Sequence, residues 1–142
     1  MSWACLRGIT TYSAKPPSRW MPIACCLHGV DMAGIRAGSS VVVLGGGVIG
    51  LLVVQLVRLA GATTVILSTR QAAKRRLAEE VGATATVDPS STDIIEQIAG
   101  DTGLVPGGVD VVIECAGVAE TVMQSTRLAR SGGTVVILGV MP

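Results

Sequence analysis

Residues 41–50 read Val-Val-Val-Leu-Gly-Gly-Gly-Val-Ile-Gly, and this stretch decides the fold. Its first four residues are typical of a buried strand, and a helix-length apolar segment follows the glycines. Gly45, Gly47 and Gly50 fit the pattern G-x-G-x-x-G: the first permits a tight bend, the second lets a pyrophosphate approach the backbone, and the third lets strand and helix pack closely. The position of the pattern between strand and helix predicts a dinucleotide-binding turn.

The start of the following helix contributes to the same predicted site. The backbone N–H groups of Val48, Ile49 and Gly50 would face the phosphates, with the positive end of the helix dipole behind them. A membrane helix is the alternative, because residues 41–57 are largely apolar and Gly46 and Gly50 have the spacing found in helix pairs. A span needs about 20 apolar residues, and three consecutive glycines interrupt this run. We therefore expect no membrane span.

Strands and helices alternate regularly from residue 39 onward. Strands are expected at 41–44, 65–68, 84–87, 109–114 and 134–138, and helices at 48–60, 72–81, 92–99 and 119–129. Such alternation favours right-handed crossovers and a parallel sheet. The predicted fold is a doubly wound, Rossmann-type α/β domain with helices on both faces, ending after its fifth strand, whereas the strand order 3-2-1-4-5-6 needs a sixth.

The chain is expected to divide into three parts. Residues 1–21 lack helical and strand periodicity and contain Pro16 and Pro17, so an irregular or disordered lead-in is expected there. Residues 22–38 should form a linking helix, over 23–32, and a turn. Residues 39–142 would be the truncated dinucleotide-binding domain.

Composition narrows the function classes. Of the 142 residues, 49% are hydrophobic but none is Phe, so the core must be built from Val, Ile, Leu and Ala, as in a parallel sheet covered by helices. The net charge of +1 gives no reason to expect nucleic acid or an anionic membrane as a partner. The cysteines show no C-x-x-C spacing and the first 19 residues no signal peptide, so reduced thiols and a cytoplasmic location are expected.

Cys25 and His28 could suggest a metal pair, but an apolar helix carrying small thiols is the favoured interpretation, because no second pair exists. Cys25 and Cys26 are consecutive on a probable helix and would point about 100° apart. Cys115 is distant in sequence. We therefore expect no metal ligands and no bound zinc in this chain.

From about Pro22 to Pro142 the chain resembles the cofactor domain of the zinc-containing medium-chain alcohol and polyol dehydrogenases, with sorbitol- or butanediol-type members most similar. The likeness rests on residues 24–30 (ACCLHGV), 37–45 (AGSSVVVLG), 61–62 (GA), 80–84 (EVGAT), 110–114 (DVVIE) and 132–139 (GGTVVILG). The resemblance implies an oxidoreductase that moves hydride between a nicotinamide cofactor and a hydroxyl-bearing carbon.

The positions where the chain departs from the family pattern bear on its activity as much as the positions that match. In the family, a zinc held by Cys and His-Glu ligands sits in an N-terminal catalytic domain that this chain lacks, and Met21 precedes Pro22 where polyol enzymes often have Glu. We therefore expect this chain alone to be inactive, as a fragment of such an enzyme. The alternatives are a non-catalytic nucleotide-binding fragment or pseudo-enzyme, and a methyl transferase that uses a nucleoside donor.

The end of the second predicted strand indicates the cofactor. An NAD site usually places Asp or Glu there, but this chain has Ser68, Thr69 and Arg70, with Lys74 one turn further on. A carboxylate would repel a 2′-phosphate by about 4 kcal/mol at 4 Å and an effective dielectric of 20, whereas Arg offers a fork-shaped phosphate donor. NADP is therefore predicted over NAD. Lys74 and Arg75 are possible helpers, although Arg75–Glu79 and Arg76–Glu80 pairs on a solvated helix face are an alternative.

The fourth and fifth strands also end at the edge where such folds bind ligands. Cys115 and Ala116 follow one strand, and Gly139 and Val140 follow the other. By resemblance, main chain near Gly139 and Val140 would meet the nicotinamide.

Two further residues have alternative readings. Glu114 could be an acid or base, but an end-of-strand charge beside a loop is favoured because no partner is visible. His28 is expected to be structural.

The exposed edge of the fifth strand could pair two copies of the chain as a homo-oligomer.

Overall fold

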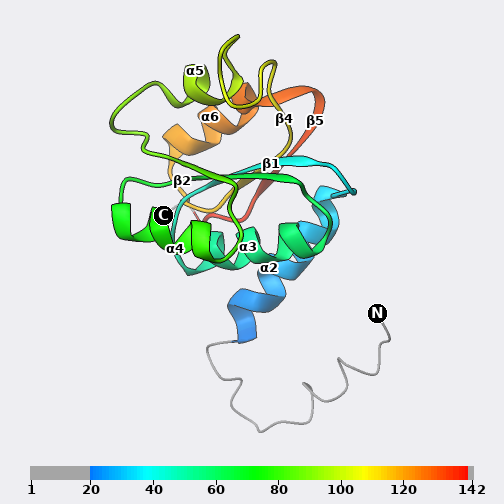
Figure 1. The fold of residues 1–142 in the computed structure, drawn as a ribbon. Coiled ribbons are helices and arrows are strands. Elements are labelled where there is room, and N and C mark those ends of the chain that lie inside the picture. The colour runs from blue at the N-terminus through cyan, green and yellow to red at the C-terminus, as the bar shows by residue number, and fades with distance from the viewer. Residues whose placement is uncertain (1–19, 141–142) are drawn as a thin grey trace, which may run out of the picture.

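A computed structural model describes residues 20–140. This part of the chain forms five helices and five strands. They alternate along the sequence, beginning with a helix (Figure 1). The helices are α2 (Trp20–Ala33), α3 (Val48–Leu59), α4 (Ala72–Glu80), α5 (Ile94–Ala99) and α6 (Ala119–Leu128). The strands are β1 (Ser40–Leu44), β2 (Thr64–Ser68), β3 (Ala85–Val87), β4 (Val109–Glu114) and β5 (Ala129–Ile137). The predicted α/β alternation is confirmed.

All strand pairs are parallel, and the sheet has the order β3-β2-β1-β4-β5. Val42 of β1 lies between Ile66 of β2 and Val112 of β4. The order reverses direction beside β1, because β2 and β4 flank it on opposite sides. In doubly wound sheets this reversal opens a crevice at the carboxyl ends of the strands, where ligands bind.

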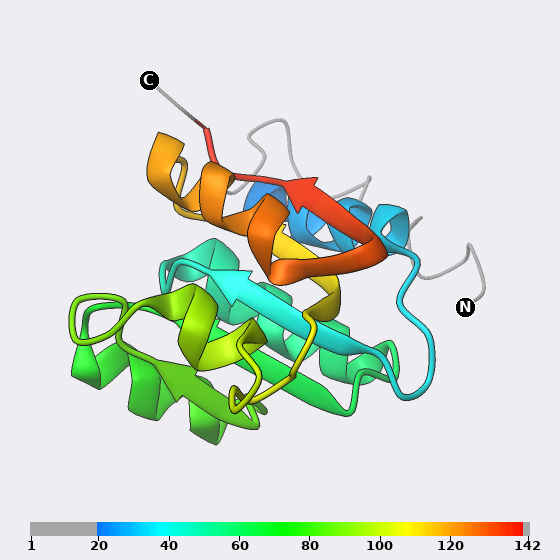
Figure 2. The ribbon, with the colours of Figure 1, turned by 90° about the horizontal axis from the view of Figure 1, so that it is seen from above.

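Helices cover both faces of the sheet, as predicted. One face packs under α2, α3 and α4, and the other under α5 and α6; Figure 2 shows α5 and α6 in front of the strands. Alternate residues of one strand serve the two cores: Val41 and Val43 of β1 face α3, while Val42 and Leu44 face α5 and α6. Both cores are aliphatic, as the absence of Phe requires.

The spacing of its apolar residues explains how α3 packs on the sheet. Its buried residues, Gly50, Val53, Val54 and Val57, recur at the helical intervals of three and four, so one stripe of the helix faces β1 and β2. A side-chain cap begins α5, where the Asp93 carboxylate accepts a hydrogen bond from the N–H of Ile95 at 2.9 Å.

Three elements begin two or more residues away from the start that the sequence predicts, and the other boundaries agree within one residue. The first helix begins at Trp20, inside the expected lead-in; residues 1–19 of that lead-in lie outside the described part of the chain. Helix α5 begins at Ile94, two residues later than predicted, because its N-cap is Asp93. The largest difference is in β5, which begins at Ala129 rather than at residue 134.

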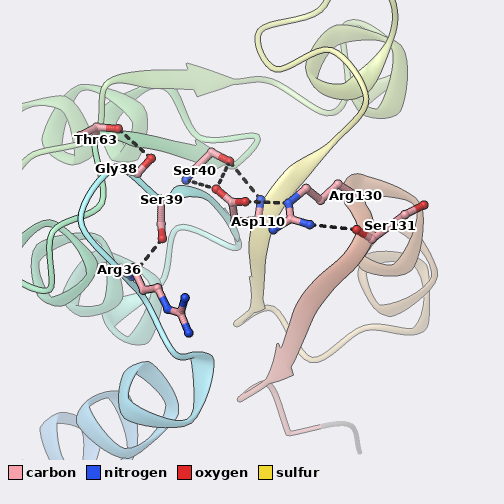
Figure 3. Close-up of polar contacts among 8 residues, drawn as sticks. All are labelled: Arg36, Gly38, Ser39, Ser40, Thr63, Asp110, Arg130 and Ser131. Atoms are coloured by element: carbon pink, nitrogen blue, oxygen red, sulfur yellow. Dashed lines mark hydrogen bonds and ion pairs between the residues drawn. The ribbon is translucent and has the colours of Figure 1, made fainter.

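The early start of β5 has a local cause. Ala129 pairs with Val109 and Thr134 with Val111, so the residues between Ala129 and Thr134 bulge out of the ladder. Asp110 occupies the matching position on β4. Its carboxylate accepts hydrogen bonds from the Ser40 N–H at 2.8 Å and from Arg130 Nε at 2.7 Å, which ties the first residues of β1, β4 and β5 together (Figure 3).

Candidate functional site: the carboxyl edge of the sheet

The glycine turn adopts the geometry predicted from its spacing. Gly45 has φ +108°, a conformation that side chains disfavour, and its N–H donates to the Ser68 carbonyl at 2.9 Å. A side chain at Gly45 would also meet the backbone nitrogen of Ala116 at 2.9 Å. The turn therefore leaves β1 in close contact with the ends of both β2 and β4.

Gly47 and Gly50 have different roles in this turn. A Cβ at Gly50 would overlap the carbonyl oxygen of Gly45, so glycine is required there for helix and turn to pack. Gly47 is exposed, has φ −74°, and no atom lies within 4 Å of where its Cβ would be. It caps α3 without a side-chain hydrogen bond. The space in front of Gly47 is therefore open to a ligand.

The first turn of α3 faces the same open space. The N–H groups of Val48, Ile49 and Gly50 precede the first backbone bond of the helix, which runs from the Leu51 N–H to the Gly47 carbonyl at 3.0 Å. No acidic residue occupies this turn. Donors at a helix N-terminus beside an open glycine fit the pyrophosphate of a dinucleotide.

A cleft of about 370 Å³ lies beside the turn, between the end of β2 and the start of α6. It contains five of the predicted residues: Gly45, Ser68, Thr69, Arg70 and Ala116. Ala116 lines it from the β4 side. The other lining residues are Gln71, Pro89, Val118, Glu120, Thr121 and Gln124.

Arg70 and Glu120 are the charged residues that line this cleft. Their side chains are 74% and 68% exposed, and Arg70 Nη2 lies 4.0 Å from Glu120 Oε2. The Thr69 N–H donates to the Val87 carbonyl at 3.1 Å, so the loop that carries Arg70 is held against β3. The end of β2 therefore presents a hydroxyl and a guanidinium to the cleft.

Lys74 and Arg75 do not line the cleft, although both were considered as helpers. Lys74 is half-buried on α4. Arg75 Nη1 donates to the carbonyls of Thr69 at 2.7 Å and Arg70 at 2.9 Å, and it also lies 3.0 Å from the Asp88 carboxylate. The role of Arg75 is therefore to brace the loop that presents Arg70.

The alternative pairing of these arginines on a helix face is wrong. Arg75 pairs with Asp88, while the Glu79 carboxylate accepts instead from the Thr86 hydroxyl at 2.7 Å. Within residues 20–140, Arg76 and Glu80 form no ion pair. Sequence spacing could not reveal this, because Asp88 reaches Arg75 only after β3 has paired with β2.

The ends of β4 and β5 meet at the second half of this edge. The Cys115 N–H donates to the Leu44 carbonyl at 2.8 Å, and the Gly139 N–H donates to the Glu114 carbonyl at 3.0 Å. Cys115 packs against the core under α2 and α3, and burial raises the pKa of its thiol. Cys115 therefore contributes main chain to the edge. Val140 is 90% exposed and free to contact a ligand.

Glu114 differs most from its expected environment. Instead of a charge beside a loop, its side chain is fully buried. Glu114 Oε1 accepts hydrogen bonds from the Ala116 N–H at 2.8 Å, the Gly117 N–H at 2.9 Å and the Thr121 hydroxyl at 2.7 Å. Two loop N–H groups and a helix hydroxyl are thus organised by one carboxylate.

The described residues do not fit a zinc site. Within residues 20–140, no three His, Cys, Asp or Glu side chains are grouped as a metal ion requires. Cys25 and His28 are exposed, whereas Cys26 is buried and its Sγ lies 3.6 Å from the Ile49 carbonyl oxygen. Burial, followed by the neighbouring Cys25, raises the pKa of Cys26 to about 11, which disfavours the thiolate that binds metals.

Within the described residues, no helix has the length and apolar character that crossing a bilayer requires.

Sequence reasoning missed Glu120 and Gln124 as cleft residues. The Gln124 amide donates to Glu120 Oε1 at 3.3 Å, four residues apart on α6. The available signal was their position at the start of the helix after β4, since that helix begins at the binding edge of the sheet.

Comparison with known proteins agrees with this geometry. A family model described as zinc-binding dehydrogenase matches residues 48–142. The chain is 38% identical over 120 residues to (R,R)-butanediol dehydrogenase of Bacillus subtilis, covering 84% of this chain and 34% of that protein. It is 31% identical over 124 residues to sorbitol dehydrogenase of Gallus gallus, covering 85% and 34%. The chain thus spans about a third of the length of the curated relatives it matches.

Solved structures show the same relationship. A protein of Sinorhizobium meliloti 1021, described as a zinc-binding dehydrogenase bound to NADP, superposes with a TM-score of 0.85 at 83% identity, covering 85% of this chain and 35% of that one. The structure of 2R,3R-butanediol dehydrogenase from Bacillus subtilis superposes with a TM-score of 0.77 at 37% identity, covering 85% and 34%. With two thirds of its length matched by the family model, and with the sheet order and glycine turn of a dinucleotide-binding domain, the chain belongs to the zinc-binding dehydrogenase family.

Proposed function

We propose that this chain binds NADP as the cofactor-binding part of an alcohol or polyol oxidoreductase. The observation that carries the proposal is the open face of Gly47 at the start of α3, beside a cleft that presents Arg70 and no carboxylate at the end of β2. The relative that is 83% identical was solved with NADP, which supports the same cofactor here.

The residues of the chain would divide the cofactor between two halves of the sheet edge. The N–H groups of Val48 and Ile49 would hold the pyrophosphate, and Arg70 would bind the 2′-phosphate. Main chain at Gly139 and Val140, across the turn from that cleft, would contact the nicotinamide. When bound, the cofactor supplies hydride chemistry, and the protein binds and orients it.

The relatives support the proposed substrate class and activity. Butanediol and sorbitol dehydrogenases among them support a hydroxyl-bearing carbon as the hydride donor or acceptor. The described residues hold no metal-ligand set, so we propose that this chain alone is inactive. A second candidate, a non-catalytic nucleotide-binding protein, is favoured by that same observation.

Location and assembly complete the proposal. Cys25, Cys26 and Cys115 are free thiols, which supports a reducing, cytoplasmic setting. The outer edge of β5 is unpaired within the described sheet, and Ile137 on this strand is exposed, which supports pairing of two copies along β5.

Calorimetric titration with NADP and NAD at one fixed salt concentration tests the cofactor. We expect NADP to bind more tightly. Arg70→Ala should weaken NADP binding and leave NAD binding unchanged, while Arg76→Ala, an exposed arginine outside the cleft, is the matched control. Thr69→Asp should shift the preference towards NAD. Equal affinities for the two nucleotides in the unmodified protein would refute the assignment.

A further inference from the structure

Gly46 and Thr69 lie against each other where the glycine turn meets the end of β2. Gly46 is buried, and a Cβ built on it would lie 2.8 Å from both Cβ and Oγ1 of Thr69 and 2.9 Å from its Cγ2. Protein interiors do not tolerate such overlap without a shift of the neighbouring atoms. The φ of Gly46 is not positive, unlike that of Gly45, so its backbone does not itself require glycine. The side chain of Thr69 is therefore what excludes a larger residue at Gly46.

Thr69 has little freedom to move away from the turn. Its N–H donates to the Val87 carbonyl at 3.1 Å, and its carbonyl accepts from Arg75 Nη1 at 2.7 Å. Arg75 is itself held by the Asp88 carboxylate at 3.0 Å. The branched side chain of Thr69 is also restricted at χ1. A side chain at Gly46 would therefore move the backbone of the loop rather than one flexible side chain.

Arg70 depends on that backbone for its position. Its carbonyl accepts a hydrogen bond from the same Arg75 side chain at 2.9 Å. Its own side chain is 74% exposed, and the ion pair with Glu120 spans 4.0 Å, which is too long for a hydrogen bond. The distance from the guanidinium to the glycine turn is therefore set by the loop at Thr69, and the contact with Gly46 lets that loop lie close to the turn.

We propose that Gly46 is a positioning residue that sets the preference for NADP by acting on Arg70 through Thr69. The proposal rests on the proposed binding of the pyrophosphate by the start of α3 and of the 2′-phosphate by Arg70. Both phosphate groups of NADP are bound at once only if the turn and the guanidinium are held at a matching separation, and a preformed separation lowers the cost of binding. NAD has only the pyrophosphate. Replacement of Gly46 therefore weakens NADP binding more than NAD binding.

The test is the ratio of the dissociation constants of NAD and NADP, measured by calorimetry at one fixed salt concentration on the full 142-residue chain. Gly46→Ala should lose about tenfold of the preference for NADP, the order expected for one hydrogen bond to a charged group. Gly47→Ala is the matched control, because no atom lies within 4 Å of its Cβ position. Any loss of affinity in that variant should be equal for both nucleotides, so the ratio should not move.

A second substitution tests whether the effect passes through Thr69. Thr69→Gly removes all three atoms that a Cβ at Gly46 would meet. In the Thr69→Gly background, adding Gly46→Ala should leave the ratio unchanged, whereas in the unmodified background it should lower it. Such a double-mutant cycle isolates the contact between the two residues. A ratio that falls equally in both backgrounds would show that Gly46 acts on the turn alone, and would overturn the inference.

Two single variants of Thr69 decide the matter if Gly46→Ala does not fold. Thr69→Val keeps the branched shape and removes the hydroxyl, while Thr69→Gly removes the contact as well. Thr69→Gly should therefore lose more of the NADP preference than Thr69→Val, and equal losses would contradict the proposal.

Failure of the inference and failure of the proposed function give different results. If the unmodified chain binds NADP no more tightly than NAD, the cofactor assignment is wrong and this inference fails with it. If the unmodified chain prefers NADP and a folded Gly46→Ala protein keeps the same ratio, only the role of Gly46 is refuted. Urea unfolding of each variant establishes that it is folded.

Discussion

Arg70 and Glu120 face each other across the mouth of the cleft, with 4.0 Å between Nη2 and Oε2. Both side chains are largely exposed, so this pair adds little to stability. We expect the ion pair to affect NADP binding instead. Glu120 neutralises the guanidinium that we propose for the 2′-phosphate, and it adds a negative charge to the same cleft.

Glu120→Gln should therefore strengthen NADP binding. Removing the carboxylate frees Arg70 and lifts a repulsion, together worth about 1 kcal/mol for an exposed site, or about fivefold in affinity. NAD, which has no 2′-phosphate, should bind as before. Parallel titrations of both nucleotides measure this, with Glu80→Gln on exposed α4 as the control. An unchanged NADP affinity would mean that Glu120 does not contribute to cofactor selection.

Gly47→Val and Gly50→Val should separate binding from folding. Gly47 has φ −74° and open space around its missing side chain, so valine is tolerated but blocks the approach of a pyrophosphate. Valine at Gly50 would collide with the Gly45 carbonyl and destabilise the protein by about 3 kcal/mol or more. Urea unfolding and NADP titration read the two effects. A folded Gly47→Val protein with normal NADP affinity would show that the turn is only structural.

Sequence predicted the parts of this molecule that depend on local chemistry. Gly45 and Gly50 each meet a steric demand of the turn, whereas Gly47 leaves the space in front of it open. The alternation of strand and helix patterns predicts a parallel sheet. The predicted start of β5 was wrong, because Ala129 joins the sheet through a bulge that depends on the pairing with β4. The roles of Arg75, Glu114 and Glu120 were missed or misjudged for the same reason: each depends on contacts with other elements.

Asp110 should make stability sensitive to acid. The N–H of Ser40 and then the guanidinium of Arg130 hold the pKa of Asp110 below its ordinary value. A lowered folded-state pKa stabilises the fold above the unfolded value of about 3.9, and this contribution is lost as pH falls through the folded-state pKa. Asp110→Asn should therefore be less stable than the unmodified protein at pH 7, with a smaller difference at pH 3.

Urea unfolding at the two pH values measures that difference. Asp101→Asn, at an exposed position in the loop after α5, is the control and should change little at either pH. A difference of equal size at pH 7 and pH 3 would show that Asp110 acts through shape and hydrogen bonding rather than through its charge.

The cysteines should differ sharply in reactivity. Cys25 is exposed, whereas burial raises the pKa of Cys26 to about 11 and that of Cys115 further. Alkylation requires the thiolate and access, so iodoacetamide at pH 7.5 should modify Cys25 at least about a hundredfold faster than the other two. Mass spectrometry of peptides from timed reactions resolves each site. Urea should make all three react at similar rates, whereas native-state alkylation of Cys26 as fast as Cys25 would contradict the packing of α2 against α3.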